Sequence, residues 1–203
     1  MKFKCFLFTL TCSLFQLEAA PNAYVTNNAG STVSVIDTSM QTVTTVTVGT
    51  APDGVAVTPN GAQTYVANSG DNTVSVIDTS MQMVVATIPV GANPISVAVT
   101  PNGTQAYVVN FGGSDVSVIN TSTQMVVATI NVGPSPSSVA ITPNGTQAYV
   151  ANEGSGNVSV IDTSMQMVIA TIPVGSAPFA VAITPDGTHA YVANFGGHYR
   201  QRN

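Results

Sequence analysis

The sequence predicts an all-β protein built from repeated four-stranded antiparallel sheets. A Tyr-Val-x-Asn tetrapeptide recurs five times, spaced 41 residues apart once and 42 residues apart three times; it begins at Tyr24, Tyr65, Tyr107, Tyr149 and Tyr191. Three further short blocks recur between the tyrosines, and each is rich in β-branched residues and bounded by turn residues. No block has helical spacing. Each of the four blocks is therefore read as one strand, so one period holds four strands.

The first complete unit places its strands at 54–58, 64–68, 73–78 and 83–90. We call these the first, second, third and fourth strands of a unit and use the same names in every other unit. In sequence order the chain holds a second-third-fourth piece, three complete units, and a final first-second piece.

Turn residues join these strands into a meander. Asn60-Gly61 between the first and second strands predicts a tight hairpin, because both residues accept a positive φ. Asp78 opens the turn between the third and fourth strands, where its side chain can accept hydrogen bonds from backbone N–H groups ahead of it. Pro89 and Pro173 interrupt the fourth strand, and proline cannot donate to a ladder, so this strand is expected at the outer edge with the first strand inside.

Repeated four-stranded meanders of about 40 residues are typical of β-propeller blades. Tyr24-Val25-Thr26-Asn27 resembles the signature of the YVTN β-propeller repeat family, and the Ser-Val-Ile-Asp and Thr-Pro-Asn-Gly blocks match its other signatures. The resemblance extends over residues 24–194. It implies an exported propeller of the kind found in cell-surface or surface-layer proteins.

The sequence allows two arrangements of the chain ends. The terminal first strand, at 180–184, could join the initial piece and close a four-bladed ring by strand exchange, which would leave the last second strand, at 188–194, surplus. An open, incomplete ring would expose apolar blade faces and favour self-association. We assign 21–194 to the propeller repeats and 195–203 to an irregular tail, whose sequence suggests a truncated or frameshifted repeat.

Residues 1–20 have the order of a secretory signal peptide: Lys2 and Lys4, an apolar run at 5–15, then Ala19 and Ala20. The apolar run is too short to span a membrane, so we expect no membrane insertion once the signal is removed. Export to the periplasm, the cell surface or the medium follows. Cys5 and Cys12 both lie inside this segment, so the mature chain is expected to be free of cysteine.

Composition excludes several partners. The stretch 5–199 contains no Lys or Arg, so this stretch offers no cations to nucleic-acid phosphates.

His189 and His198 are the only histidines, and neither has a partner at metal-ligand spacing. A symmetric calcium ring of Asp37, Asp78 and Asp162 is less favoured than turn capping, because Asn120 replaces the aspartate in the remaining unit.

These observations predict a protein without catalysis or cofactor. Some relatives on propeller scaffolds are lactonases or bind modified haems, so a small-molecule enzyme or cofactor carrier is the alternative. A phosphosugar lactonase would need cations, and a haem site would need axial and propionate partners, which the basic-residue and histidine content disfavours. A truncated fragment of a larger propeller is a further alternative.

Loops at one end of the blades vary between units, whereas Pro-Asn-Gly and Asp-Thr-Ser at the other end are nearly copied. Binding surfaces usually lie on loops held by a rigid scaffold, so the variable end is the candidate interaction face for an unknown protein or glycan partner. Drift after duplication explains the same variability. The candidate residues are Asp53, Asp71, Ile95, Phe111, Asp115, Ser137, Glu153 and Phe179.

Overall fold

The computed structural model describes residues 22–196, which form five antiparallel sheets, here called blades 1 to 5. Blade 1 holds β1 (Asn22–Asn27), β2 (Thr32–Asp37) and β3 (Thr42–Thr47). Blade 2 holds β4 (Pro52–Val57), β5 (Gln63–Asn68), β6 (Thr73–Asp78) and β7 (Met83–Pro89). Blade 3 holds β8 (Pro94–Val99), β9 (Gln105–Asn110), β10 (Asp115–Asn120) and β11 (Met125–Asn131). Blade 4 holds β12 (Pro136–Ile141), β13 (Gln147–Asn152), β14 (Asn157–Asp162) and β15 (Met167–Pro173), and blade 5 holds β16 (Pro178–Ile183) and β17 (Ala190–Asn194).

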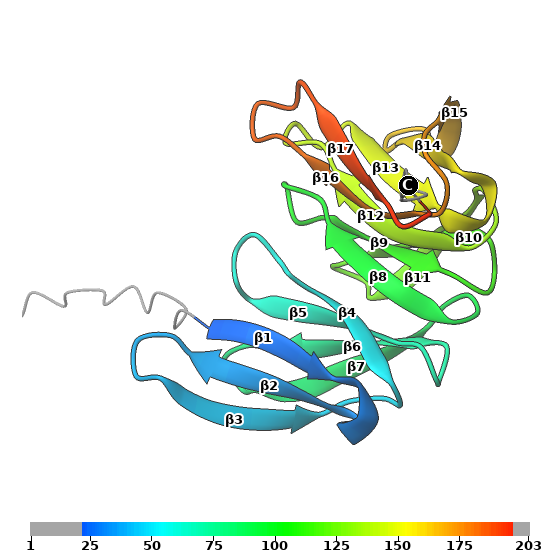
Figure 1. The fold of residues 1–203 in the computed structure, drawn as a ribbon. Helices are drawn as coiled ribbons and strands as arrows, with labels where there is room; N and C mark the ends of the chain where they lie inside the picture. The colour runs from blue at the N-terminus through cyan, green and yellow to red at the C-terminus, as the bar shows by residue number, and fades with distance from the viewer. Residues whose placement is uncertain (1–21, 197–203) are drawn as a thin grey trace, which may run out of the picture.

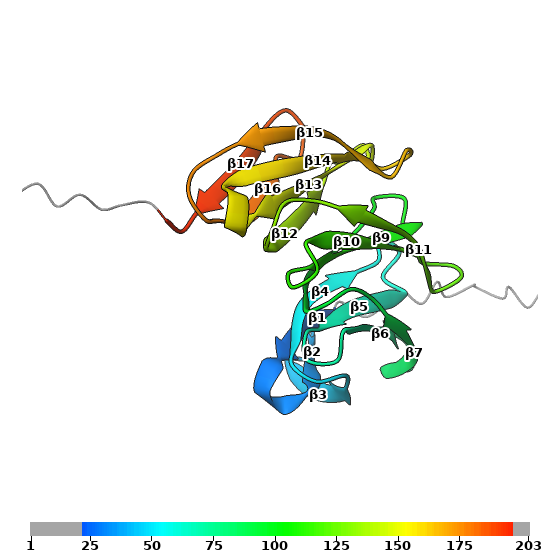
Figure 2. The same cartoon turned by 90° about the vertical axis from the view of Figure 1, so that its right-hand side faces the viewer.

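The blades follow one another along an arc (Figure 1), and Figure 2 shows the same succession from a second side. Each complete blade has the strand order of its sequence, and β4, β8, β12 and β16 lie next to one another along the inside of the arc. The predicted meander, with the first strand inside and the fourth at the outer edge, is confirmed. Two short 3-10 helices, η1 (Asn28–Gly30) and η2 (Glu153–Ser155), follow β1 and β13.

The hydrophobic core lies between blades. Tyr65, Val74 and Ile88 of blade 2 pack against Val97 and other apolar residues of blade 3, and equivalent clusters join blades 1 and 2 and blades 3 and 4. Alternation along the strands sends successive side chains to the two faces of a blade, so blades 2 and 3 each contribute to two of these clusters. Burial raises the pKa of Tyr65 to about 12.

The predicted hairpin between the first and second strands is confirmed, with residues 58–62 between β4 and β5. Gly61 N donates to Thr58 O at 2.8 Å, Pro59 lies second in the turn, and Gly61 has a φ of +69°. Asn60 is not among the residues with positive φ. Of the two residues that accept a positive φ only Gly61 adopts it, because Pro59, with its φ near −65°, sets a turn in which only the glycine needs the left-handed region.

One missing residue explains the single period of 41. In blades 2 to 4 the pairing of the third and fourth strands shifts by one residue, for example between Val76 and Ile77, which leaves Val85 as a β-bulge in the seven-residue β7. The six-residue β3 pairs with β2 without a shift. Pro89 and Pro173 end their strands and do not interrupt them.

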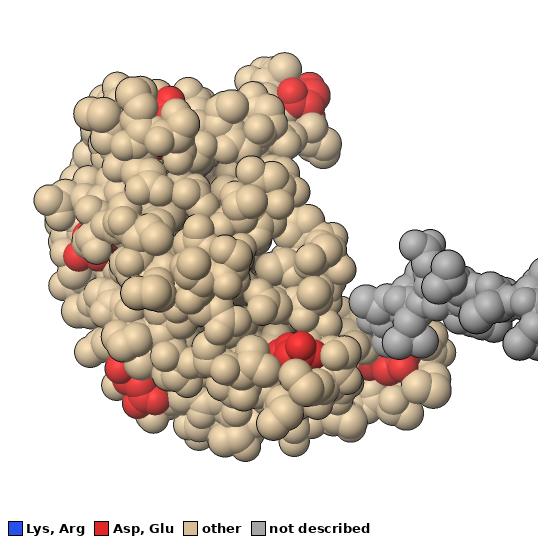
Figure 3. All heavy atoms as spheres, turned by 180° about the vertical axis from the view of Figure 1, so that it is seen from behind, with Lys and Arg blue, Asp and Glu red and all other residues tan. Residues whose placement is uncertain are grey.

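The ring is open. Within residues 22–196, β16 pairs with β17 and does not join β1, so these residues do not form the four-bladed ring closed by strand exchange. In the space-filling view of Figure 3 the two ends of the arc lie on either side of a wide hollow. The repeat geometry continues through Phe195 and Gly196, whose N–H groups donate to Ala177 O and Ser176 O as in the other units. The expected signal peptide and residues 197–203 lie outside the described residues. Among residues 22–196 no helix is long and apolar enough to cross a membrane.

Candidate functional site

The two ends of the blades form two rims. The turn rim comprises the Pro-Asn/Asp-Gly turns and the Asp/Asn-Thr-Ser turns of the blades. Within blade 2 the Thr79 hydroxyl donates to Gly61 O at 2.6 Å and so ties these two turns together, and Thr121 and Thr163 do the same in blades 3 and 4. These repeated contacts give the near-identical turn sequences a structural role.

The aspartates of the turn rim cap turns. Asp78 Oδ1 accepts hydrogen bonds from Ser80 N, Met81 N and the Ser80 hydroxyl at 2.6–2.9 Å. Asn120 Oδ1 accepts the same three bonds at 2.7–3.0 Å. The hydroxyl of Ser80 and the N–H of Met81 hold the pKa of the Asp78 carboxyl below its usual range. The turn-capping prediction is confirmed, since an uncharged amide performs the same role.

The loop rim, at the opposite ends of the blades, carries the candidate interaction residues. Asp53, Ile95, Ser137 and Phe179 are each the second residue of a first strand, on the inner side of the arc. The side chains of Asp53 and Phe179 are exposed and that of Ile95 is half-buried. Ser137 is buried, and its hydroxyl donates to Pro178 O at 2.9 Å, so this residue cannot contribute its side chain to a free surface.

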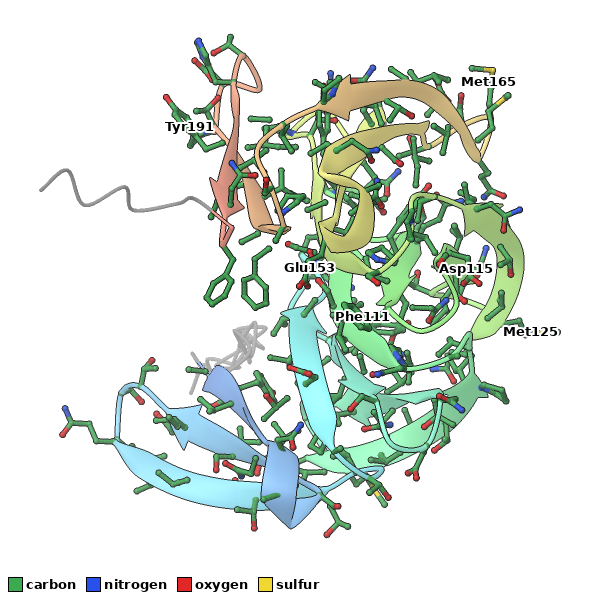
Figure 4. All side chains as sticks on the ribbon, turned by 45° about the vertical axis from the view of Figure 1, so that its right-hand side comes forward. Phe111, Asp115, Met125, Glu153, Met165 and Tyr191 are labelled. Carbon is green, nitrogen blue, oxygen red and sulfur yellow. The ribbon has the colours of Figure 1, made fainter. Side chains whose placement is uncertain are left out.

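Phe111 and Glu153 occupy equivalent positions directly after the signature asparagine. Their N–H groups donate to Asn93 O and Ser135 O at 2.9 Å, which fixes the start of each loop against the strand connection before it. Figure 4 shows both residues toward the concave side of the arc, whereas Met125 and Met165 point outward from its convex side. The same position holds Asn28, Ser69 and Phe195 in the other units.

The carboxylates of the loop rim come from three blades, blades 2, 3 and 4. Asp71 Oδ2 accepts a hydrogen bond from Thr50 N at 2.6 Å, and this bond lowers the pKa of Asp71. Asp115 Oδ1 accepts one from Asn110 Nδ2 at 2.6 Å. Asp53 and Glu153 belong to blades 2 and 4, and partial burial raises the pKa of Asp53. Within residues 22–196 no three His, Cys, Asp or Glu side chains gather where they could hold a metal ion.

Sequence reasoning missed the role of the signature asparagine. Asn68 is fully buried, and its Nδ2 donates to Thr73 Oγ1 at 3.0 Å and Ser75 Oγ at 2.9 Å. A Cβ added at Gly49 would lie 2.6 Å from Asn68 Cγ. The glycine of each Val-Gly pair therefore makes room for the asparagine of the next blade, and the recurrence of both residues in every period was the signal that could have revealed the contact.

Two equivalent hollows lie beside these asparagines. One, of about 310 Å³, is lined in part by Gly133, Asn157 and Ser159, and the other, of about 470 Å³, by Gly49, Thr73 and Ser75. All eight lining residues of the second hollow have a counterpart in the first across 84 positions, two periods of 42, and Pro134 is the one lining residue of the first without a counterpart. Hydroxyl, amide and short apolar groups predominate in both hollows, but the second also contains the carboxylate of Asp71, so only the first presents a neutral hydrogen-bonding surface.

The comparisons with known proteins agree on the fold. The chain resembles a solved structure of Kuenenia stuttgartiensis hydrazine synthase, with a TM-score of 0.81 and 30% identity over 86% of this chain and 53% of that one. It also resembles a functionally unknown protein from Desulfotomaculum acetoxidans, with a TM-score of 0.75 and 17% identity over 87% of this chain and 60% of that one. No family model and no curated protein matches.

The fold is that of a β-propeller, present in the described residues as an open arc of meander blades. The chain spans about half the length of the first solved relative. Fold alone does not define an activity.

Proposed function

We propose that this chain is an exported, non-catalytic propeller repeat protein of the YVTN type, which acts as a structural or interaction module at the cell envelope or outside the cell. The observation that carries the proposal is the contrast between the two rims. Repeated hydrogen bonds account for the turn rim, whereas Phe111, Glu153 and Phe179 of the loop rim differ from their equivalents on the same scaffold.

The electrostatics support a neutral partner. Lys and Arg are confined to residues 2, 4, 200 and 202, and in Figure 3 the acidic side chains lie singly on the face in view. The hydrogen-bonding hollows, one of which contains the carboxylate of Asp71, and the exposed Phe179 suit a protein or glycan surface better than an anion. The separation of the carboxylates gives the alternative of an enzyme no support.

Binding to purified envelope fractions of the source organism tests the interaction role. The change F111A combined with E153A is expected to weaken cosedimentation of the full chain at least several-fold. The matched control M81A combined with M165A alters exposed residues of the turn rim and is expected to leave it unchanged. Equal losses in both variants, or no cosedimentation of the wild type, would contradict the proposal.

Export has its own test. The full chain with a tag after Asn203 is expressed in a bacterial host, and the N-terminus of the product is read by mass spectrometry. The proposal expects cleavage after Ala19 or Ala20 and recovery outside the cytoplasm. An intact N-terminus in the cytoplasm would argue against export.

A piece of a larger propeller remains the alternative that a specific observation favours, because this chain covers 53% of the first solved relative. The DNA that follows the codon of Asn203 tests it. Further Val-Ser-Val-Ile-Asp units in any reading frame there would support the larger propeller.

A further inference from the structure

The interfaces between blades have two unlike sides. The side that faces the next blade consists of a tyrosine of the second strand, two valines of the third strand and an isoleucine of the fourth; in blade 2 these are Tyr65, Val74, Val76 and Ile88. The side that faces the previous blade draws residues from all four strands; in blade 3 these include Val97, Val108, Ile119 and Val126. We call them the trailing and leading faces.

Blade 1 carries a leading face that the described residues leave uncovered. Val25, Ile36 and Val43 correspond to Val66, Ile77 and Val84 of blade 2, which pack against blade 1. Val66 is fully buried, whereas its equivalent Val25 is 47% exposed. The edge of β1 that would pair with a first strand is also unpaired in the described sheet.

Blade 5 has only β16 and β17 in the described residues, so it carries the second-strand part of the complementary trailing face, Tyr191, without the valines and isoleucine of a third and fourth strand. Tyr191 is 67% exposed, although its equivalents Tyr65 and Tyr107 are fully buried. Figure 4 shows Tyr191 at the end of the arc, on the side of β17 away from blade 4. Blade 1 therefore exposes leading-face residues and blade 5 exposes a trailing-face residue. At three internal interfaces, leading and trailing faces pack against each other.

We propose that a second copy of this chain covers both faces, so that two chains form a closed ring with two-fold symmetry. Each blade 1 packs against the partner's blade 5, with Val25 against the partner's Tyr191, as Val108 and Tyr65 share one core within the chain. The two end faces support this occupant, because Val25 and Tyr191 belong to the two opposite sides of one kind of internal interface. Two head-to-tail contacts between the same two chains give a closed ring when the two arcs complete each other. This proposal does not depend on the proposed export or envelope role.

The test uses the mass of the full chain by light scattering over a range of concentrations. The changes V25D and Y191D each place a carboxylate on one end face; both residues are exposed in the single chain, so neither change should prevent folding. The expected result is a two-chain mass for the wild type and a single-chain mass for each variant, a twofold drop. V85D, at an exposed valine of the outer edge, is the control and should keep the two-chain mass.

Mixing the two variants makes the test specific. A mixture of V25D and Y191D contains one unaltered leading face and one unaltered trailing face on different chains, so it should regain the two-chain species that neither variant forms alone. A wild type that stays single-chain, a mass that grows without limit, or a V25D variant that still dimerises alone would each overturn the proposal.

Discussion

At the residue scale, the signature asparagine is best explained as a packing and hydrogen-bonding residue. Its Nδ2 bridges two polar groups of the third strand in each of the first four units, such as Asp115 and Ser117 for Asn110. Its Oδ1 is buried without a protein partner in blades 2, 3 and 4. Such repeated buried acceptors are typical sites for an ordered water.

Gly91 tests this packing. A Cβ there would lie 2.5 Å from Asn110 Nδ2, so G91A should lower the free energy of unfolding by about 1–3 kcal/mol through overpacking. In an N110A background the clash is gone, and the same change should cost far less; the difference measures the coupling. Urea unfolding of the four proteins checks this. G30A, where an added Cβ meets nothing closer than 3.4 Å, is the control, and additive effects of G91A and N110A would refute the contact.

The turn-capping aspartates predict how stability responds to acid. Hydrogen bonds hold the pKa values of Asp37, Asp78 and Asp162 below 3.8 in the folded protein. Their stabilisation is therefore present above pH 3.8 and is lost as pH falls from there through the folded-state pKa values. The triple change to asparagine, which Asn120 already represents, should flatten the decline of stability below about pH 4, as measured by thermal unfolding at successive pH values.

Asp53 supplies a control of opposite sign. Burial raises its pKa, so its ionisation costs stability as pH rises from 3.8 through the raised folded-state value. D53N should remove that cost and leave the acid decline as steep as in the wild type. An equally flattened acid decline in D53N would show that the turns are not the source.

At the element scale, the sequence predicts the strands well where turn residues bound them on both sides. The expected third strand at 73–78 coincides with β6, because the loop before it and Asp78 at its end both mark its limits. The first strand begins two residues earlier than expected, at Pro52, because Pro52 pairs with Asn68 across an irregularity that no local pattern signals.

The contacts between blades could not be predicted from the sequence. Period-2 alternation identifies which side chains share a face, but the packing of Gly49 against Asn68 depends on how adjacent blades approach each other. The burial of Ser137 has the same origin, since its hydroxyl bonds to the next blade's Pro178. Candidate residues chosen from loop variability could therefore be located on a rim, but their exposure could not be predicted.

The bulge in the fourth strand gives a prediction for a whole element. Deletion of Val85 converts β7 into a six-residue strand like β3, which pairs without a bulge, so we expect a change in unfolding free energy below about 1 kcal/mol. Deletion of Val76 in β6 should abolish cooperative unfolding, because it moves the following side chains to the opposite face of a buried strand. Guanidinium unfolding compares the two; equal damage would show that the bulge is required.

At the scale of the whole molecule, a linear array of blades should unfold from its ends. Blades 2, 3 and 4 have a neighbour on each side, whereas blades 1 and 5 have a neighbour on only one side within the described residues. Amide hydrogen exchange should therefore be slowest in β9 and β10 of the central blade and at least about tenfold faster in β3 and β17. If two chains complete a ring, the protection of β1 and β17 should rise with protein concentration while that of β9 stays constant. Uniform protection at every concentration would contradict both the end-to-centre gradient and the assembly that depends on exposed ends.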